Sequence, residues 1–440
     1  MDYQTFLQSK SKRFTGDGFA CDCGTLPLAM FEWQRKIVQW ACAKGRCAIW
    51  ADTGLGKTIM QLAWADQVVR QTGQSVLILT PLAVSSQTAK EAERFGLRAT
   101  IAHGQDDICG PGIYVTNYHK LHRFNASVFG GVVLDESSIL KSFTGKVKNL
   151  LEQTFKQTPF RLACTATPAP NDHLELGNHG QFLGIMNSNE MISRWFINDA
   201  MEAGNYRLKG HAKSDFWSWV ASWALVIHSP SDLGYDSTGY DLPALIIHHI
   251  TIPTTGIHID GMLFADASLS ATTLHTVLRQ TAPIRAKKAA EIVKGLDGAS
   301  VLLWTHTNYE ADEIRRVIQT DEVRGSDSDE HKELMLLGFA DGSVTRLLTK
   351  PSLAGFGMNW QACHNMIFVG MDYSYEKFYQ AVRRCWRYGQ TQEVNAYLLC
   401  TDMEWRLFDA LAKKQASHTT MQNEMIAMMK EEYAELTNQR

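Results

Sequence analysis

The stretch Ala51-Asp52-Thr53-Gly54-Leu55-Gly56-Lys57-Thr58 decides the fold of the first part of this chain. It follows the apolar run 47–50 and precedes the helix-prone run 59–69, which gives the order strand, glycine loop, helix. Two glycines let the backbone curl so that successive N–H groups point inward, where they and the helix N-terminus hold phosphate oxygens. The order therefore predicts a nucleotide-binding P-loop rather than a glycine turn with an incidental lysine.

Positions within the octapeptide predict separate contacts to a nucleotide. Lys57 is expected to neutralise the β- and γ-phosphates, and the Thr58 hydroxyl is expected to ligate Mg²⁺. ATP and Mg²⁺ are therefore the expected cofactors. Upstream, Gln34 can present a donor and an acceptor to an adenine edge, beside an aromatic residue that can stack. The backbone expected to cradle the phosphates consists of Thr53, Gly54, Leu55 and Gly56.

The apolar stretch 132–134 ends in two adjacent carboxylates, Asp135 and Glu136, which is a Walker B pattern. Asp135 at a strand tip can hold Mg²⁺, while Glu136 can orient and deprotonate the attacking water. A pair of acidic residues after a strand also occurs as a solvated turn. The P-loop upstream favours the catalytic interpretation.

Composition indicates a soluble globular protein of two or three domains, since 440 residues that are 45% hydrophobic and 20% charged can bury a large core. A stretch of about 18 apolar residues is absent, and the first 14 residues are unlike a signal peptide, so we expect a cytoplasmic protein without membrane contact. Nine scattered cysteines fit reduced thiols, and the close pair Cys21 and Cys23 has no second pair at zinc-site spacing. A net charge of −3 means that nucleic-acid phosphates must be met by local groups.

Short β-type runs alternate with helical patterns in two separate stretches, which predicts two α/β domains with parallel sheets. Ligand sites of such sheets lie beyond the carboxyl ends of the strands, where the P-loop falls. The second stretch contains no P-loop of its own. The expected strands are 46–50, 76–80, 113–117, 131–135 and 161–165 in the first domain, and 300–305, 344–348, 365–369 and 394–399 in the second.

The expected division is an N-terminal ATP-binding lobe (1–178), a Trp-rich connecting segment of helix and loop (179–253), a C-terminal lobe (254–402) and a helical tail (403–440). In the connecting segment, aromatic and apolar residues at helical spacing favour a packed stripe over a base-stacking platform. His248 and His249 are assigned to a strand end or the surface. The tail is expected to pack on the second domain or on a partner. The stripe consists of Phe216, Trp219, Val220 and Trp223, and one face of the tail carries Met421, Met425 and Met428.

The string 380–390 carries three arginines, Arg383, Arg384 and Arg387. If it is helical, Gln380, Arg384 and Arg387 stand at positions i, i+4 and i+7, so two guanidinium groups share one face. Planar guanidinium groups suit the charge that develops on a transferring γ-phosphoryl group. A solvated basic helix face is the alternative, but arginines in a domain without a P-loop favour a composite site.

Taken in order, these elements resemble the motifs of superfamily 2 helicases over residues 26 to 400. The forms of the P-loop and of the string 380–390 are similar to the Swi/Snf-type branch, particularly to compact helicases of phages and prophages. The resemblance implies two RecA-like lobes with an ATP cleft between them and nucleic acid across both. It assigns Gln34, Gly357 and Gln380 to ATP binding, Arg384 and Arg387 to arginine fingers, and Thr165 to Pro168 with Gly355 to Asn359 to coupling.

Three positions depart from the related sequences. Ser137 and Ser138 stand where relatives often carry Ala or Gly and then Asp or His, which leaves their coupling contacts open. Trp360 is bulky for its position and is expected either to stack on a base or to fill core.

The resulting prediction is a DNA-stimulated ATPase that moves along DNA, mostly contacting phosphate and sugar. The alternatives are an RNA helicase of the same superfamily, an ATP-gated scaffold for a replication or recombination partner, and the motor subunit of a restriction or defence complex. Host-cell cytoplasm is the expected location if a phage encodes the chain. Candidate contacts to the nucleic acid, from loop position or from the resemblance, are Thr80, Ser85, Asn117, Lys141, Thr165, Thr167, Thr305, Lys350, Ser352 and Asn359.

Overall fold

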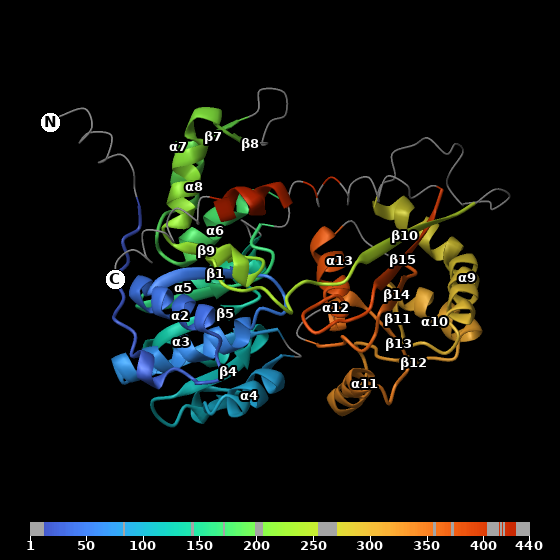
Figure 1. Ribbon diagram of the computed structural model, residues 1–440, viewed down its shortest axis with the longest axis horizontal. Coiled ribbons are helices and arrows are strands. Elements are labelled where there is room, and N and C mark those ends of the chain that lie inside the picture. The colour runs from blue at the N-terminus through green and yellow to red at the C-terminus, as the bar shows by residue number, and fades with distance from the viewer. Residues whose placement is uncertain are drawn as a thin grey trace. The chain divides into compact units, whose positions relative to one another are not determined.

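The structure is a computed structural model that forms two compact units (Figure 1). Unit 1 comprises Met1–Ser237 and Ala416–Arg440, and unit 2 comprises Thr238–Gln415. Each unit is built on a parallel sheet with helices packed against it, which confirms the predicted pair of α/β lobes. The residues that the structure describes are 13–81, 84–141, 145–169, 172–198, 206–253, 271–354, 358–370, 374–402, 413, 416 and 419–427.

Unit 1 contains a seven-stranded parallel sheet in the order β3-β4-β2-β5-β6-β1-β9, beside a separate hairpin of β7 and β8. Its strands are β1 (Arg46–Ala51), β2 (Ser75–Thr80), β3 (Ala99–Ile101), β4 (Ile113–Asn117), β5 (Phe129–Asp135), β6 (Phe160–Cys164), β7 (Phe196–Asn198), β8 (Tyr206–Leu208) and β9 (Ala224–Ile227). Its helices are α2 (Glu32–Lys44), α3 (Lys57–Thr72), α4 (Ser85–Arg94), α5 (Lys146–Thr154), α6 (Glu175–Phe182), α7 (Ser188–Trp195) and α8 (Lys213–Ala221).

The central strands of this sheet are buried over their whole length. Every residue of β2 and β5 is buried, which matches their nearly continuous apolar sequences and is typical of parallel strands covered on both faces. The five strands expected in the first domain are all present, while β3 and β9 were not expected. The sequence signal was weaker there because β3 has only three residues, none of them buried, and β9 only four.

Unit 2 contains a six-stranded parallel sheet in the order β10-β15-β14-β11-β13-β12. Alternate residues of β11 point to opposite faces of the sheet. Leu302 and Trp304 pack with α11 and α13, whereas Val301 and Leu303 pack with α9 and α10. Both faces are therefore covered, as Figure 1 shows. The elements are β10 (Leu245–Ile252), α9 (Ala271–Gly295), β11 (Val301–Trp304), α10 (Asn308–Val317), β12 (Asp321–Glu322), α11 (Asp329–Asp341), β13 (Arg346–Thr349), α12 (Pro351–Ala354), β14 (Asn365–Phe368), α13 (Tyr375–Val382) and β15 (Val394–Thr401).

The stretch 179–253 is divided between the two units instead of standing apart. Strand β9 pairs with β1 in the first sheet, and β10 pairs with β15 over eight residues in the second. The stripe Phe216, Trp219, Val220 and Trp223 is at most 2% exposed, which confirms the packed-stripe interpretation. The sequence did not reveal the division of 179–253 between the two units, because the pairing of β9 and β10 depends on strands far away in the sequence.

His248 and His249 lie within β10, so their assignment to a strand end is wrong. His248 Nε2 is 2.8 Å from Asn395 Oδ1, and its ring stacks on Tyr397 with centroids 4.5 Å apart. His249 is exposed, in keeping with the surface alternative. Polar side chains are accommodated here because β10 is an edge strand of the sheet.

Residues 419–427 of the tail pack on unit 1, so the expected docking on the second domain is wrong for this part of the tail. Glu424 accepts hydrogen bonds from Lys213 Nζ (2.5 Å) and Trp217 Nε1 (3.0 Å) of α8. Met421 and Met425 are buried, which agrees with the predicted apolar face, and Met428 lies outside the described residues. A salt bridge and an indole hydrogen bond from a residue more than 200 positions away decide this docking, and sequence spacing does not reveal them.

All nine cysteines are free thiols. Among the described residues, no group of three or more His, Cys, Asp and Glu side chains is placed to hold a metal ion. A search of the described helices also finds none with the length and apolar character needed to cross a membrane.

A buried ion pair stands at the carboxyl end of β11 in unit 2. Arg285 of α9 and Glu310 of α10 are both fully buried, with Nη2 and Oε1 3.2 Å apart. Arg285 also donates to the Val369 carbonyl (2.8 Å), and Glu310 accepts from the N–H groups of His306 (2.9 Å) and Thr307 (2.8 Å). The pair thus ties α9 and α10 to the ends of β11 and β14.

We expect Arg285→Met to lower the free energy of unfolding of unit 2 by about 3–5 kcal/mol, because Glu310 would remain as an uncompensated buried charge. The matched control is Arg315→Met, which removes an exposed partner of Glu322 and should cost less than about 1 kcal/mol. Urea unfolding followed by circular dichroism measures both. Equal losses for the two variants would contradict this role of the buried pair.

Candidate nucleotide site

The glycine loop between β1 and α3 adopts the curled backbone that its sequence predicts. Gly54 has φ 91° and Gly56 has φ 73°, a region that residues with a Cβ rarely adopt. A Cβ at position 56 would lie 2.5 Å from Gln34 Nε2, so any other residue would have to displace the end of the Gln34 side chain. The loop thus presents its N–H groups at the start of α3, where phosphates bind.

Gln34 lies against this loop, as its predicted role at the nucleotide site requires. It is only 5% exposed; Oε1 accepts from Phe31 N–H (3.1 Å) and Nε2 donates to the Leu55 carbonyl (3.1 Å). Its amide therefore joins the beginning of α2 to the loop. Of the neighbouring aromatic residues, Phe31 is half exposed and able to stack, whereas Trp33 is buried. Adenine recognition by Gln34 stays a prediction.

Lys57 holds its ammonium group against the loop. Its Nζ donates to the carbonyls of Ala51 (2.9 Å) and Asp52 (3.3 Å). Burial lowers the pKa of Lys57, and the nearby carboxylates of Glu136, Asp52 and Asp135 oppose that shift. A phosphate group would supply negative charge to this half-buried cation, so the residues present fit a bound nucleotide.

Asp135 ends β5 beside the loop and is fixed by two groups that sequence reasoning missed. Its Oδ1 accepts from Gln61 Nε2 (2.8 Å), and its carbonyl accepts from the Tyr118 hydroxyl (2.7 Å). Burial raises the pKa of Asp135, whereas the Gln61 hydrogen bond and the charge of Lys57 lower it. Gln61 was detectable in principle, because it lies one helical turn after Lys57 on α3. Carboxylate and hydroxyl oxygens suit Mg²⁺, so Asp135 and Thr58 fit the predicted cation.

Glu136 has a positive φ of 56°, which is uncommon for a residue other than glycine. Its Oε2 accepts from Thr165 Oγ1 at 3.3 Å, and the same Thr165 oxygen accepts from Thr167 N–H at 3.1 Å. Both threonines are fully buried. The segment 165–167 therefore contacts the predicted catalytic carboxylate directly, which is compatible with the coupling role assigned to it and leaves these two residues inaccessible to a nucleic acid.

Strand β9 adds a histidine to the loop. The Asp52 N–H donates to the Ile227 carbonyl (2.9 Å), and His228 Nδ1 lies 3.9 Å from Asp52 Oδ2. Asp52 Oδ1 in turn accepts from Thr53 N–H at 2.7 Å. Sequence reasoning missed His228 because it placed this stretch outside the first lobe.

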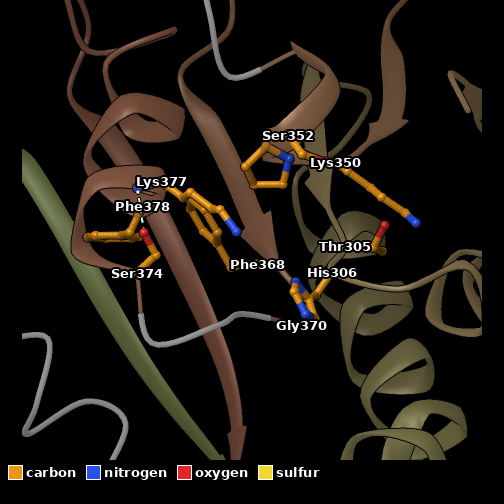
Figure 2. Close-up of a pocket in the computed structure, with 10 residues that line it drawn as sticks. Thr305, His306, Lys350, Ser352, Phe368, Gly370, Ser374, Lys377 and Phe378 are labelled. Atoms are coloured by element: carbon orange, nitrogen blue, oxygen red, sulfur yellow. Dashed lines mark hydrogen bonds between the residues drawn. The ribbon is translucent and has the colours of Figure 1, made fainter. Parts of the chain in front are cut away.

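In unit 2, a cavity of about 80 Å³ opens at the carboxyl ends of β11, β13 and β14 (Figure 2). It brings together three predicted contacts, Thr305, Lys350 and Ser352. Lysine and hydroxyl side chains of this kind suit a phosphate oxygen. Sequence reasoning missed the other polar members, which are His306, Ser374 and Lys377.

The polar wall of this cavity is organised by its own contacts. Lys350 Nζ donates to Asn308 Oδ1 at 2.6 Å, and Ser374 Oγ accepts from Lys377 N–H at 3.3 Å, which caps α13. Gly370 lies so close to Glu310 that a Cβ there would come 2.1 Å from Oε1. The buried ion pair thus supports the floor of the cavity, and the two lysines stand at its edges.

The remaining predicted contacts have different surroundings. Thr80 is fully buried; its hydroxyl lies 2.8 Å from Ser85 Oγ and donates to the Thr116 carbonyl, so it is not accessible. Asn117, opposite Thr80 in the register, is 6% exposed. Asn359 is exposed and Lys141 is half-buried.

The helix expected over 380–390 ends at Val382, so the shared helical face of Arg384 and Arg387 is wrong. Instead both guanidinium groups donate to one carbonyl, that of Met358, at 3.3 and 3.1 Å, and Arg384 Nε also donates to the Gln380 carbonyl. After Val382 the backbone continues in turns, with the N–H groups of Arg384 and Cys385 bonded to the carbonyls three residues before them, and the Arg384 carbonyl accepts from Trp360 N–H at 3.0 Å. Gly357 lies outside the described residues.

Trp360 fills core. It is fully buried, donates to the Leu336 carbonyl at 3.2 Å and packs edge-on against Phe339. This decides between the two roles left open for it.

Ser137 follows the two carboxylates and meets His179 of α6, with Oγ and Nε2 3.1 Å apart. His179 is fully buried, and that burial lowers its pKa from 6.5 to about 4. Because the unfolded chain takes up the proton first, stability present above pH 6.5 should be lost as the pH falls towards 4, by up to about 3 kcal/mol.

We therefore expect His179→Gln to flatten the dependence of the unfolding free energy on pH between 6.5 and 4, as measured by urea unfolding at several pH values. The exposed His122→Gln is the control for the substitution itself. A wild-type slope in His179→Gln would contradict the lowered pKa.

Two families of known domains match this chain. The DEAD/DEAH box helicase family matches residues 31–176, and the helicase conserved C-terminal domain matches residues 285–389. The solved structure described as the Sulfolobus solfataricus SWI2/SNF2 ATPase core in complex with dsDNA is 18% identical over 93% of this chain and 95% of that chain, with a TM-score of 0.43. None of the curated proteins is significantly similar in sequence. The first match covers the P-loop and the Asp-Glu strand end of unit 1 and the second covers most of the string 380–390, so over these two segments the chain is similar to DEAD/DEAH box helicases and to the helicase conserved C-terminal domain.

Proposed function

We propose that this chain is an ATP-dependent DNA translocase of the Swi/Snf-type branch, which hydrolyses ATP and moves along duplex DNA without strong sequence preference. The observation that carries the ATPase part is the convergence of Lys57, Asp135 and Glu136 at one edge of the first sheet. The likeness of the string 380–390 to that branch supports the choice of DNA.

In the proposed reaction the loop N–H groups and Lys57 hold the phosphates, Thr58 and Asp135 hold Mg²⁺, and Gln34 contacts the adenine. When bound, Mg²⁺ neutralises charge on the β- and γ-phosphates. Glu136 accepts a proton from the attacking water and aligns the water oxygen with the γ-phosphorus. Thr165 donates to the Glu136 carboxylate, so it keeps one carboxylate oxygen oriented.

Arg384 and Arg387 are proposed as arginine fingers, which stabilise the charge spreading over the transferring γ-phosphoryl group. Both donate to the Met358 carbonyl, so their guanidinium groups are held together beside the loop that ends at Asn359. A shared carbonyl orients both groups before substrate arrives, which lowers the entropy lost in reaching the transition state.

The cavity of unit 2 is the proposed contact to the nucleic-acid backbone. Lys350 and Lys377, with Thr305 and Ser352, supply cations and hydroxyl donors but no arrangement that reads base edges. Because the net charge of the chain is −3, the attraction of DNA must come from such local cationic groups.

Three other functions remain as outcomes of the tests. RNA that stimulates turnover more than DNA would indicate an RNA helicase. Binding of ATP without turnover would indicate an ATP-gated scaffold for a replication or recombination partner, and activity only with a nuclease chain would indicate the motor of a restriction complex. The cytoplasmic location stays a prediction.

Lys57→Ala, Glu136→Gln and Arg387→Ala should each lower DNA-stimulated ATP hydrolysis by about 10³-fold or more, because each removes phosphate, water or transition-state contacts. Turnover is measured with duplex DNA, single-stranded DNA and RNA, together with strand and triplex displacement. The exposed Lys156→Ala and Arg98→Ala are the controls. A wild-type rate in any one active-site variant would refute the role given to that residue.

Lys350→Ala and Lys377→Ala should each raise the DNA concentration for half-maximal stimulation and reduce the slope of log affinity against log salt by about 1. The maximal rate at saturating DNA should stay near that of the wild type. The exposed Lys294→Ala of the same unit is the control. An unchanged salt slope in both variants would exclude the cavity as a phosphate contact.

A further inference from the structure

Helix α6 holds both ends of the short turn that follows Glu136. That turn is the 3₁₀ segment η5 (Ser137–Lys141). At its beginning, Ser137 Oγ lies 3.1 Å from His179 Nε2; at its end, the Lys141 carbonyl accepts from Asn178 Nδ2 at 3.2 Å. Two adjacent residues of one helix therefore fix the first and last residues of the turn.

These polar contacts lie in the interior. Ser137, Asn178 and His179 are all fully buried, and the His179 ring meets the edge of Trp50 with centroids 5.4 Å apart. Burial of polar groups is costly unless they are hydrogen-bonded. Apolar side chains would fill the same space without that cost, so stability alone does not account for this pair.

The residue just before the turn has a strained backbone. Glu136 has φ 56°, and a non-glycine residue in this region costs on the order of 1–3 kcal/mol. Such a conformation persists only where the surroundings hold it. The Glu136 side chain accepts a hydrogen bond from Thr165 Oγ1, and its backbone continues directly into the turn held by α6.

We propose that Asn178 and His179 are positioning residues that clamp η5 and thereby hold the Glu136 carboxylate in place for water activation. The proposal rests on the catalytic role proposed for Glu136. Both residues lie beyond the segment 31–176 that matches the DEAD/DEAH box helicase family. The sequence left the contacts of Ser137 open, and the structure shows that its hydroxyl meets His179 of α6.

The clamp affects the chemical step more than nucleotide binding. In the proposed function ATP is held through the loop, Lys57 and Gln34; Lys57 donates to the Ala51 and Asp52 carbonyls, and the Gln34 amide bonds to Phe31 and Leu55. Loosening the turn acts first on the carboxylate that directly precedes it, and a displacement of about 1 Å at a reacting group can cost about 100-fold in rate.

The kinetic test compares His179→Leu with the conservative His179→Gln in the full chain. His179→Leu should lower kcat of DNA-stimulated hydrolysis by about 10- to 100-fold while KM for ATP changes by less than about 2-fold. His179→Gln keeps a hydrogen-bonding group towards Ser137 and should restore most of kcat. A wild-type kcat in His179→Leu, or equal defects in both variants, overturns the clamp.

A matched pair of serine variants separates the clamp from general loss of packing. Ser137→Ala removes the hydroxyl that meets His179 and should lower kcat, whereas Ser222→Ala removes an equally buried hydroxyl that donates to the Trp219 carbonyl and should not. Equal effects of the two substitutions would overturn the proposal.

A second readout does not need catalysis. Amide hydrogen exchange of 136–141 should become at least about 10-fold faster in His179→Leu than in the wild type and stay unchanged in Ser222→Ala. If the wild type hydrolyses no ATP with any nucleic acid, the proposed function fails, and this exchange measurement still decides the clamp. Unchanged exchange in His179→Leu overturns it even if turnover falls.

Discussion

Parallel pairing of β1 and β5 on the two sides of β6 is the constraint on which the candidate site depends. Cys164 of β6 pairs with Ile49 on one side and with Asp135 on the other. Three strands therefore end at the same level, and their loops begin together. This register brings the P-loop, the two carboxylates and Thr165 to one end of the sheet, although the P-loop and Thr165 lie more than 100 positions apart in the chain.

Burial sets the electrostatics of that edge. It lowers the pKa of Lys57 and raises that of Asp135, so in each case the charged form is disfavoured by the low-dielectric surroundings. A triphosphate with its cation adds charges of both signs at this place, which offsets the cost of charging each group. The residues present therefore fit a highly charged ligand, and Gln61 and Tyr118 fix the position of Asp135 through hydrogen bonds.

The second unit uses the same strand-end geometry for another purpose. It lacks a P-loop in its sequence, and a buried pair of Arg285 and Glu310 occupies the carboxyl end of β11 beneath a small cavity edged by two lysines. The chain then returns to unit 1, where Glu424 docks on α8. The backbone therefore passes between the units twice, whereas two lobes joined by one linker would need a single crossing.

The sequence by itself determined the two parallel α/β lobes, the P-loop and the Asp-Glu strand end, because hydrophobic periodicity, glycine conformation and strand-end chemistry are local properties. It also marked Thr305, Lys350 and Ser352, which follow strands. Tertiary structure alone decided the rest: that Thr80 is buried, that the helix before Arg384 stops at Val382, that residues 419–427 pack on unit 1, and that His179 meets Ser137. Each of these depends on contacts between residues distant along the chain, and the free energy of such a contact is not encoded in the spacing of either partner.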